Sequence, residues 1–390
     1  MHSIAGTAGS NGLQLAVVDR ARQNAINEQL AGLGPDAFRL LTSVTRKLGE
    51  GPWDLAGVRN LAFLLAYCYS NEDDLVVFLD DDILLTSAVY RGQFVEVDGA
   101  SLIRELLSST PNRDLVASGV AYFGQFDGSI LDHLRLVSED TLGLLSGDPR
   151  DCDSREQAAA LLEELSLFPS TLPVQLAFAG ARESTEGPGI SGALFATTPA
   201  SLYSHFLPFC YNEDWIWLAL LGQPGAAIRR ISFRALHAAP PQLEIVSAVL
   251  DYQNIGEVVY RAVRSAMNDA QSGGTALEQC GNTVSADHFL SAKESLIREM
   301  QSLLDVRVRI DRSLSRWPDE GALRVSARSA LARVERHIED VLLRVEAVNH
   351  AALHLWFRRY LADIPEWRNL LERARARLCE DIETHSGSHP

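Results

Sequence analysis

Short β-rich segments alternate with longer helical segments between Leu13 and about Leu243. This alternation is typical of an α/β domain in which helices connect the strands of one sheet. The helix expected at 55–69 is apolar around most of its circumference, so it must be covered on more than one side. The sequence therefore predicts an α/β fold with a mixed, mostly parallel sheet. The expected strands are 13–18, 38–42, 74–79, 115–122, 175–179, 192–197 and 227–236, with a further helix at 23–33 and a helical, acidic insertion at 137–170.

The β pattern disappears after about Leu243, and the last third of the chain carries apolar residues at helical spacing. We expect helices at 285–304 and 322–378, which form a C-terminal helical extension. Charge divides the chain in a similar way, because residues 1–300 have a net charge of −17 and residues 301–380 a net charge of +3. The predicted domains are an α/β domain at 1–250 and a helical region at 251–390.

One apolar stripe in this helical region is too long to be left in water. We expect it to pack on another helix, on the α/β domain or on a second copy of the chain, which makes a homodimer through the C-terminal helices one possibility. The stripe consists of Leu331, Val334, Ile338, Val341, Leu342, Val345, Val348 and Leu353.

Composition excludes several classes of protein. With 46% hydrophobic and 22% charged residues the chain is typical of folded globular proteins, and a net charge of −16 argues against nucleic acid as a partner. The five cysteines form no CxxC pair, which fits a reducing compartment better than a disulfide framework. The N-terminus lacks the pattern of a signal peptide, and no apolar run approaches the roughly 18–20 residues of a transmembrane helix. We therefore expect a cytoplasmic protein without a transmembrane segment.

Three aspartates, Asp80, Asp81 and Asp82, directly follow the apolar strand expected at 74–79. Alternate side chains of an extended backbone share one side, so Asp80 and Asp82 come together there. Two such carboxylates repel each other unless a cation lies between them, and oxygen ligands suit Mg²⁺ or Mn²⁺. At the carboxyl end of a parallel strand, a phosphorylated ligand commonly completes the metal's shell. The alternatives are a solvated acidic turn and a phosphatase nucleophile at Asp80, although Leu84 stands where the phosphatase motif Asp-x-Asp-x-Thr has threonine.

Five motifs follow one another in a characteristic order: Asp19, Gly57–Asn60, Phe78–Ile83, Gly189–Phe195 and Asn212–Trp215. In this order they resemble the motifs of GT-A-fold glycosyltransferases of family 2, over roughly residues 13–240. The resemblance implies a Rossmann-like GT-A catalytic domain at 1–250. It also implies a hexosyltransferase-type enzyme that moves a sugar from a nucleotide-diphosphate donor to the hydroxyl of an unidentified acceptor.

The same resemblance implies donor-binding and metal-binding residues. Asp19 would contact the nucleoside, Arg59 and Asn60 would lie against the donor, and Asp80 and Asp81 would face its nucleotide. Arg59 would offer its guanidinium to the diphosphate.

The metal, Mg²⁺ or Mn²⁺, would be bound by Asp82, with Asp80 and His237 as further ligands. His237 follows an expected strand, from whose end an imidazole can reach such an ion.

The resemblance also implies catalytic and acceptor-binding residues. The resemblance implies that Asp214 is the base that activates the acceptor hydroxyl of an inverting enzyme, with Glu213 as the alternative. Both carboxylates open an expected helix, where free amides and the helix dipole also favour negative charge for structural reasons alone. Gly189, Gly192 and Trp215 would lie near the acceptor.

The sequence also departs from the family pattern. Only residues 1–12 precede the first expected strand, and Val58 replaces the customary alanine. A sugar nucleotidyltransferase is an alternative, although the segment Gly9–Gly12 is not followed by the basic residue that such a phosphate loop carries. The second alternative is a non-catalytic binding or scaffold protein, in which the helical third recruits a partner.

Overall fold

The computed structural model describes the chain in separate stretches. They are residues 28, 32–44, 55–79, 83–84, 88–90, 93–95, 104, 108, 115–123, 182–183, 194–208, 210, 212–221, 228–238, 247–269, 276–315 and 322–386. In β2, β3, β4, β5, β6 and β8, defined below, the description covers the backbone alone. The strands expected at 13–18 and 175–179 and the insertion at 137–170 lie outside these residues, as does nearly all of the helix expected at 23–33.

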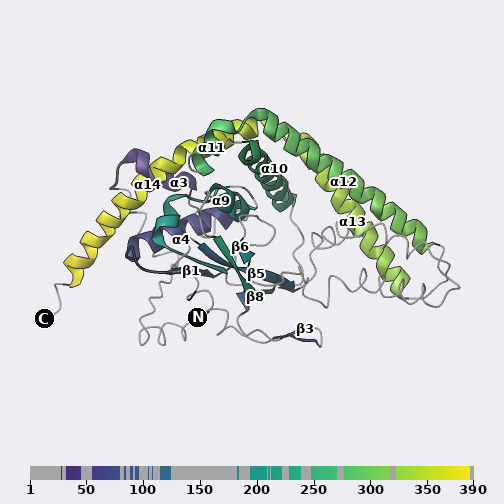
Figure 1. Cartoon of the computed structure of the whole chain (residues 1–390), viewed down its shortest axis with the longest axis horizontal. Helices are drawn as coiled ribbons and strands as arrows, with labels where there is room; N and C mark the ends of the chain where they lie inside the picture. Colours follow the sequence, from purple (N-terminus) through teal and green to yellow (C-terminus); the bar gives the residue numbers. More distant parts are fainter. Residues whose placement is uncertain are drawn as a thin grey trace.

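Helices make up most of the described residues (Figure 1). They are α3 (Pro35–Val44), α4 (Leu55–Tyr69), the 3₁₀ helix η3 (Pro199–Tyr203), α9 (Glu213–Leu221), α10 (Ser247–Asp269), α11 (Ala276–Thr283), α12 (Ala286–Leu314), α13 (Ala322–Ala347) and α14 (His350–Ser386). The strands are β1 (Val76–Leu79), β2 (Ile83–Leu84), β3 (Ala88–Tyr90), β4 (Gln93–Val95), β5 (Leu115–Phe123), β6 (Arg182–Glu183), β7 (Leu194–Thr197) and β8 (Ile228–Ala238).

The predicted mostly parallel, Rossmann-like sheet is wrong for the part of the chain that the structure describes. The main sheet has the order β1-β7-β5-β8-β2, with β6 also paired to β8, and β3 and β4 form a separate antiparallel pair. Among these pairings only β5–β8 is parallel. The two strands with described side chains, β1 and β7, are antiparallel. The apolar pattern within a strand does not encode the direction of the neighbouring strand. The predicted parallel pairing was wrong for this reason.

The strand expected at 38–42 is also wrong, because this segment belongs to helix α3. Gly34 has a φ of 101°, a conformation that favours glycine, and Pro35 occupies the first helical position, where its missing N–H costs nothing. Ala37, Leu40 and Leu41 are buried at helical spacing. A short apolar run fits either a strand or a buried helix, and here packing against α4 and α14 decided for the helix.

A bulge divides the pairing of β5 with β8. Ser118 pairs with Ile231, but Gly119 pairs with Arg234, so β8 has two extra residues at this point. Bulges bend strands and increase their twist. Strand β7 pairs with β5 before the bulge, and β2 pairs with β8 after it. The sheet therefore has two halves, with β1 and β7 in one and β2 in the other.

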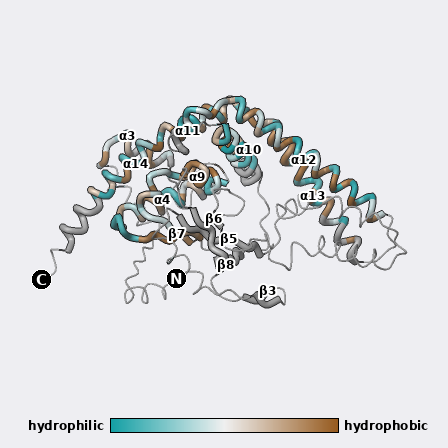
Figure 2. Tube along the Cα trace, viewed as in Figure 1, coloured by the Kyte–Doolittle hydropathy of each residue, from teal (hydrophilic) through white to brown (hydrophobic). Residues whose placement is uncertain are grey.

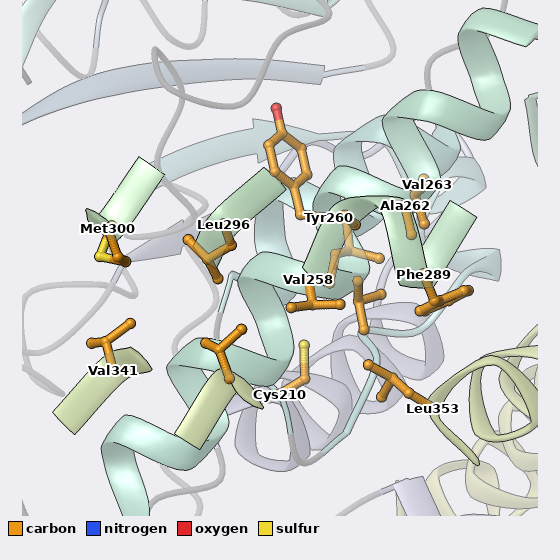
Figure 3. Close-up of a cluster of buried hydrophobic side chains, with 14 of the residues drawn as sticks. Cys210, Val258, Tyr260, Ala262, Val263, Phe289, Leu296, Met300, Val341 and Leu353 are labelled. Atoms are coloured by element: carbon orange, nitrogen blue, oxygen red, sulfur yellow. The ribbon is translucent and has the colours of Figure 1, made fainter. Parts of the chain in front are cut away.

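Two apolar cores hold the molecule together. The first core lies among α10, α12, α13 and the first half of α14, and its side chains converge in Figure 3. The second core lies among α3, α4, β7, η3 and the second half of α14. Helix α9 contributes Ile216 and Leu220 to the first core and Trp217 and Leu218 to the second. It is apolar all round because it is buried between two cores (Figure 2).

The C-terminal helices leave the sheet in two directions. Helices α12 and α13 lie side by side as a long arm, whereas α14 runs the other way over α4 and α3 (Figure 1). The prediction that the stripe from Leu331 to Leu353 packs on another helix is confirmed, because it is buried in the first core, where α13 packs on α12. Both cores draw residues from both sides of residue 250, and the predicted domain boundary there stays a prediction.

None of the helices in the described stretches is both long enough and apolar enough to cross a membrane.

Candidate functional site

Several predicted site residues lie outside the described residues. They are Asp19, Asp80, Asp81, Asp82, Gly189 and Gly192, and His237 is described by its backbone alone. The structure does describe the strands on either side of the three aspartates, since β1 ends at Leu79 and β2 begins at Ile83. These strands belong to the two halves of the bulged sheet.

The register of β2 with β8 places His237 opposite the residue that follows Asp82 in the sequence. Ile83, the residue after Asp82, pairs directly with His237, and Leu84 pairs with Leu236. His237 also pairs with Tyr122 of β5. A segment that follows Asp82 and a histidine 155 positions after it in the sequence thus meet on neighbouring strands.

Arg59 and Glu213 form a buried ion pair between α4 and α9. The distance from Arg59 Nη1 to Glu213 Oε1 is 2.5 Å, and the side chains are only 14% and 2% exposed. The Arg59 guanidinium also lies over the ring of Phe206, 5.8 Å from its centroid. The structure therefore brings together a residue predicted for the donor and one predicted for catalysis. In this arrangement each of them neutralises the charge of the other.

Asn60 holds the backbone of the segment that leads to α9. Its side chain donates to the carbonyl of Phe206 at 3.0 Å and accepts from the N–H of Phe206 at 2.7 Å, and Asn60 is fully buried. These two bonds satisfy backbone groups that would otherwise be costly to bury. Donor contact by Asn60 stays a prediction, and the role that the structure gives it is to fix Phe206.

Three further side chains fix the same segment from other helices. Trp217 of α9 donates to the carbonyl of Ser204, Tyr360 of α14 to that of His205, and Trp367 of α14 to that of Leu202, at 2.8, 2.8 and 3.0 Å. Sequence reasoning missed this arrangement, because these donors lie on two helices, α9 and α14, that are far apart in the chain. The segment 202–206 is consequently tied to α4, α9 and α14 together.

Glu213 and Asp214, called the acidic pair below, are the first two residues of α9. The Asp214 carboxylate accepts a hydrogen bond from the N–H of Trp215 at 2.9 Å, and the N–H of Ile216 donates to the carbonyl of Asn212 at 3.0 Å. The amides and dipole at this end of a helix favour negative charge. Glu213 is sealed from solvent, whereas Asp214 is only partly buried. The Trp215 ring lies edge-on to Tyr260 of α10, with centroids 5.4 Å apart. Its contact with an acceptor stays a prediction.

A polar network links the start of α9 to α10 and α12. Asn212 Nδ2 donates to Glu257 at 3.1 Å, and Glu257 accepts from Arg261 Nε at 2.8 Å. Arg261 also pairs with Glu299 and donates to Ser295 Oγ at 3.3 Å. The (i, i+4) spacing of Glu257 and Arg261 was visible in the sequence, but its connection to Asn212 was not.

A serine, a histidine and an aspartate are linked at the start of α12. Ser285 Oγ lies 2.8 Å from His288 Nδ1, and His288 Nε2 lies 3.1 Å from Asp269. This order resembles a hydrolase triad. However, the backbone N–H of Ser285 also donates to Nδ1, the bond that defines a capping box, and Ser285 is the residue directly before the helix. We interpret the arrangement as a helix cap.

His205 is completely buried between α14 and the second core. Burial lowers the pKa of its imidazole to about 4, against a smaller opposing effect of its hydrogen bond to the Phe206 carbonyl. Nδ1 donates this bond at 2.9 Å, and Nε2 has no hydrogen-bond partner among the described residues. The ring lies edge-on to Tyr360 and Trp367. The imidazole is therefore neutral and belongs to the packing between α14 and the segment 202–206.

Within the described stretches, no three histidine, cysteine, aspartate or glutamate side chains are grouped so that they could hold a metal ion. The predicted ligands Asp80, Asp82 and His237 are not among the side chains that this statement covers.

Comparisons of the chain with protein-family models, with curated proteins and with solved structures found no match.

Proposed function

We propose that the chain is a metal-dependent glycosyltransferase, which moves a sugar from a nucleotide-diphosphate donor to an acceptor hydroxyl. The observation that carries the proposal is the pairing of Ile83 with His237. This register places the backbone of His237 opposite the residue that directly follows Asp82 in the sequence. A carboxylate and an imidazole are both good ligands for Mn²⁺-like ions.

In this proposal, different residues bind the metal and act as the base. Asp82 and His237 would hold Mg²⁺ or Mn²⁺, with Asp80 as a further carboxylate. The bound ion would stabilise the negative charge that develops on the departing diphosphate. Asp214 would accept the proton of the acceptor hydroxyl as that oxygen attacks the sugar, and the reaction would invert the anomeric centre.

The geometry of α9 favours Asp214 over Glu213 as the base. A base must lie within hydrogen-bond reach of the acceptor. Glu213 is 2% exposed and bound to Arg59, so access for an acceptor would require this buried pair to break. Asp214 is the more accessible carboxylate of the two. Arg59 then supports the acidic turn by holding Glu213.

The metal-binding part of the proposal predicts the outcome of a thermal-shift experiment. UDP-, GDP-, TDP- and CMP-sugars should be tested with and without Mn²⁺, and the true donor should raise the melting temperature chiefly when Mn²⁺ is present. Asp82→Ala and His237→Ala should each lose this Mn²⁺-dependent shift. Asp73→Ala, which removes an exposed aspartate before β1, should keep it. A full shift with full sugar transfer in Asp82→Ala would contradict the metal assignment. A panel without any shift would contradict the enzyme and favour a scaffold protein.

The catalytic part predicts that Asp214→Asn lowers turnover by about 10²- to 10⁴-fold, the usual contribution of a general base. Donor affinity should change little, because the residue faces the acceptor. Asp287→Asn is a matched control, since Asp287 is the second residue of α12 as Asp214 is of α9. Turnover should be measured with isotope-labelled donor and the product's anomeric configuration determined by NMR. A retained configuration, or a loss of donor binding in parallel with turnover, would rule out this role.

A further inference from the structure

Asn212, the residue directly before the acidic pair, has an unusual backbone conformation. Its φ is 61°, and it is the only non-glycine residue with a positive φ among those that the structure describes. Such a conformation is unfavourable for a residue with a Cβ and persists only when its surroundings impose it. Asparagine tolerates it better than most residues because its short amide can make local hydrogen bonds. The contacts of this amide are part of the surroundings that impose the conformation.

The amide of Asn212 is held from the helical third of the chain. Its Nδ2 donates to Glu257 Oε2 at 3.1 Å, while the other oxygen of Glu257 accepts from Arg261 Nε at 2.8 Å. Glu257 thus uses its two oxygens for two different partners. One partner is Asn212, the residue directly before α9, and the other lies one turn further along α10.

Arg261 extends the network to α12. It pairs with Glu299 through Nη2 and donates to Ser295 Oγ through Nη1. Burial by itself would lower the pKa of Arg261, but the charges of Glu257 and Glu299 and their hydrogen bonds outweigh that effect and raise it. The guanidinium is therefore a permanent cation between two carboxylates, a geometry that suits its fixed fork of donors.

The apolar packing next to this network keeps its helices in place. Val258 and Ala262 of α10 and Leu296 and Met300 of α12 are buried in the first core (Figure 3). Helices α10 and α12 are accordingly fixed relative to each other, and so are the polar side chains on them. A rigid frame of this kind can hold a carboxylate at the start of α9 within a narrow range of positions.

We propose that Glu257 and Arg261 are positioning residues, which fix the first turn of α9 through Asn212 and thereby aim the Asp214 carboxylate. The helical third of the chain would then be part of the active site's support, which is a role that its sequence did not suggest. The catalytic half of this inference rests on the proposed function; the structural half does not.

Hydrogen exchange measures the structural half directly. The amides of Trp215 and Ile216 report on the first turn of α9, because they donate to Asp214 and to Asn212. In the full-length chain, Glu257→Ala should speed exchange at these two amides by about tenfold, the effect of losing one hydrogen bond of ordinary strength. Glu294→Ala is the matched control, since Glu294 forms an exposed (i, i+4) pair with Arg298 on α12. It should leave both amides unchanged.

A double-mutant cycle separates positioning from a general loss of stability. Asn212→Gly keeps the left-handed backbone available and removes the amide. In that background Glu257→Ala should produce no further increase in exchange at Trp215 and Ile216, because the partner is already gone. Equal exchange in Glu257→Ala and Glu294→Ala, or fully additive effects in the cycle, would overturn the inference.

Kinetics test the catalytic half. Glu257→Ala should lower kcat by about tenfold while the KM for the donor stays unchanged, since the variant alters the aim of the base and not donor binding. Faster exchange with unchanged kcat would overturn the positioning role. If the wild-type protein transfers no sugar at all, the proposed function fails, and the exchange experiment still decides whether the network fixes α9.

Discussion

The buried imidazole of His205 shows how one residue can link stability to pH. Its folded-state pKa of about 4 lies below the ordinary value of about 6.5, because burial disfavours the charged ring. The unfolded chain therefore binds a proton at a pH where the folded chain does not. The stability that the neutral ring contributes is fully present above pH 6.5 and is lost as the pH falls toward 4.

We predict that this residue alone makes the free energy of unfolding about 2 kcal/mol smaller at pH 5 than at pH 7. His205→Phe keeps a ring against Tyr360 and Trp367 but cannot bind the proton. Urea unfolding of both proteins at the two pH values should show a smaller decrease for the variant by about that amount. The same decrease in both proteins would mean that the folded state accommodates the protonated imidazole.

At the scale of elements, α14 connects the end of the chain to its first described helices. Trp367, Leu370, Leu371 and Ala374 are buried in the second core, and Arg368 and Arg375 lie over the rings of Tyr203 and Tyr67. The Arg375 guanidinium also donates to the carbonyl of Ser70. This helix therefore covers α4 and η3 with both apolar and polar contacts.

Trp367→Ala should lower the free energy of unfolding by about 3–5 kcal/mol, the usual cost of removing a large buried side chain. Trp367 is fully buried, and its Nε1–H satisfies the carbonyl of Leu202. Leu355→Ala on the same helix is the control, because Leu355 is 61% exposed and should change stability by no more than about 0.5 kcal/mol. Equal costs in urea titrations would show that α14 is not docked as described.

At the scale of the whole molecule, the described part of the candidate site around α9 depends on both the sheet region and the helical third of the chain. Helix α9, which begins with Glu213 and Asp214, is buried between the two cores, and α14 contributes to both. The arm of α12 and α13 is linked to the start of α9 by the network around Arg261 and by the first core. Unfolding of the helical third would therefore disturb the acidic pair even though the pair is encoded before residue 250.

The site itself could be predicted only in part. The acidic pair and Arg59 stood out as charged residues opening helices in an apolar context, and the structure places Arg59 on Glu213. Their direct pairing could not be inferred, because each signal is local and the two residues are 154 positions apart. The same holds for Ile83 and His237, which only the register of β2 with β8 connects.

Local patterns in the sequence determined where the main elements lie. The 55–69 helix matches α4, the strands expected at 115–122, 192–197 and 227–236 correspond to β5, β7 and β8, and the stripe of α13 is buried. These features depend on spacing along the chain, which hydrophobic periodicity reports. Tertiary structure alone decided the antiparallel direction of most strand pairs, the helical state of 38–42 and the meeting of Asn212 with Glu257. Each of these depends on which distant surface buries a segment, and no local period carries that information.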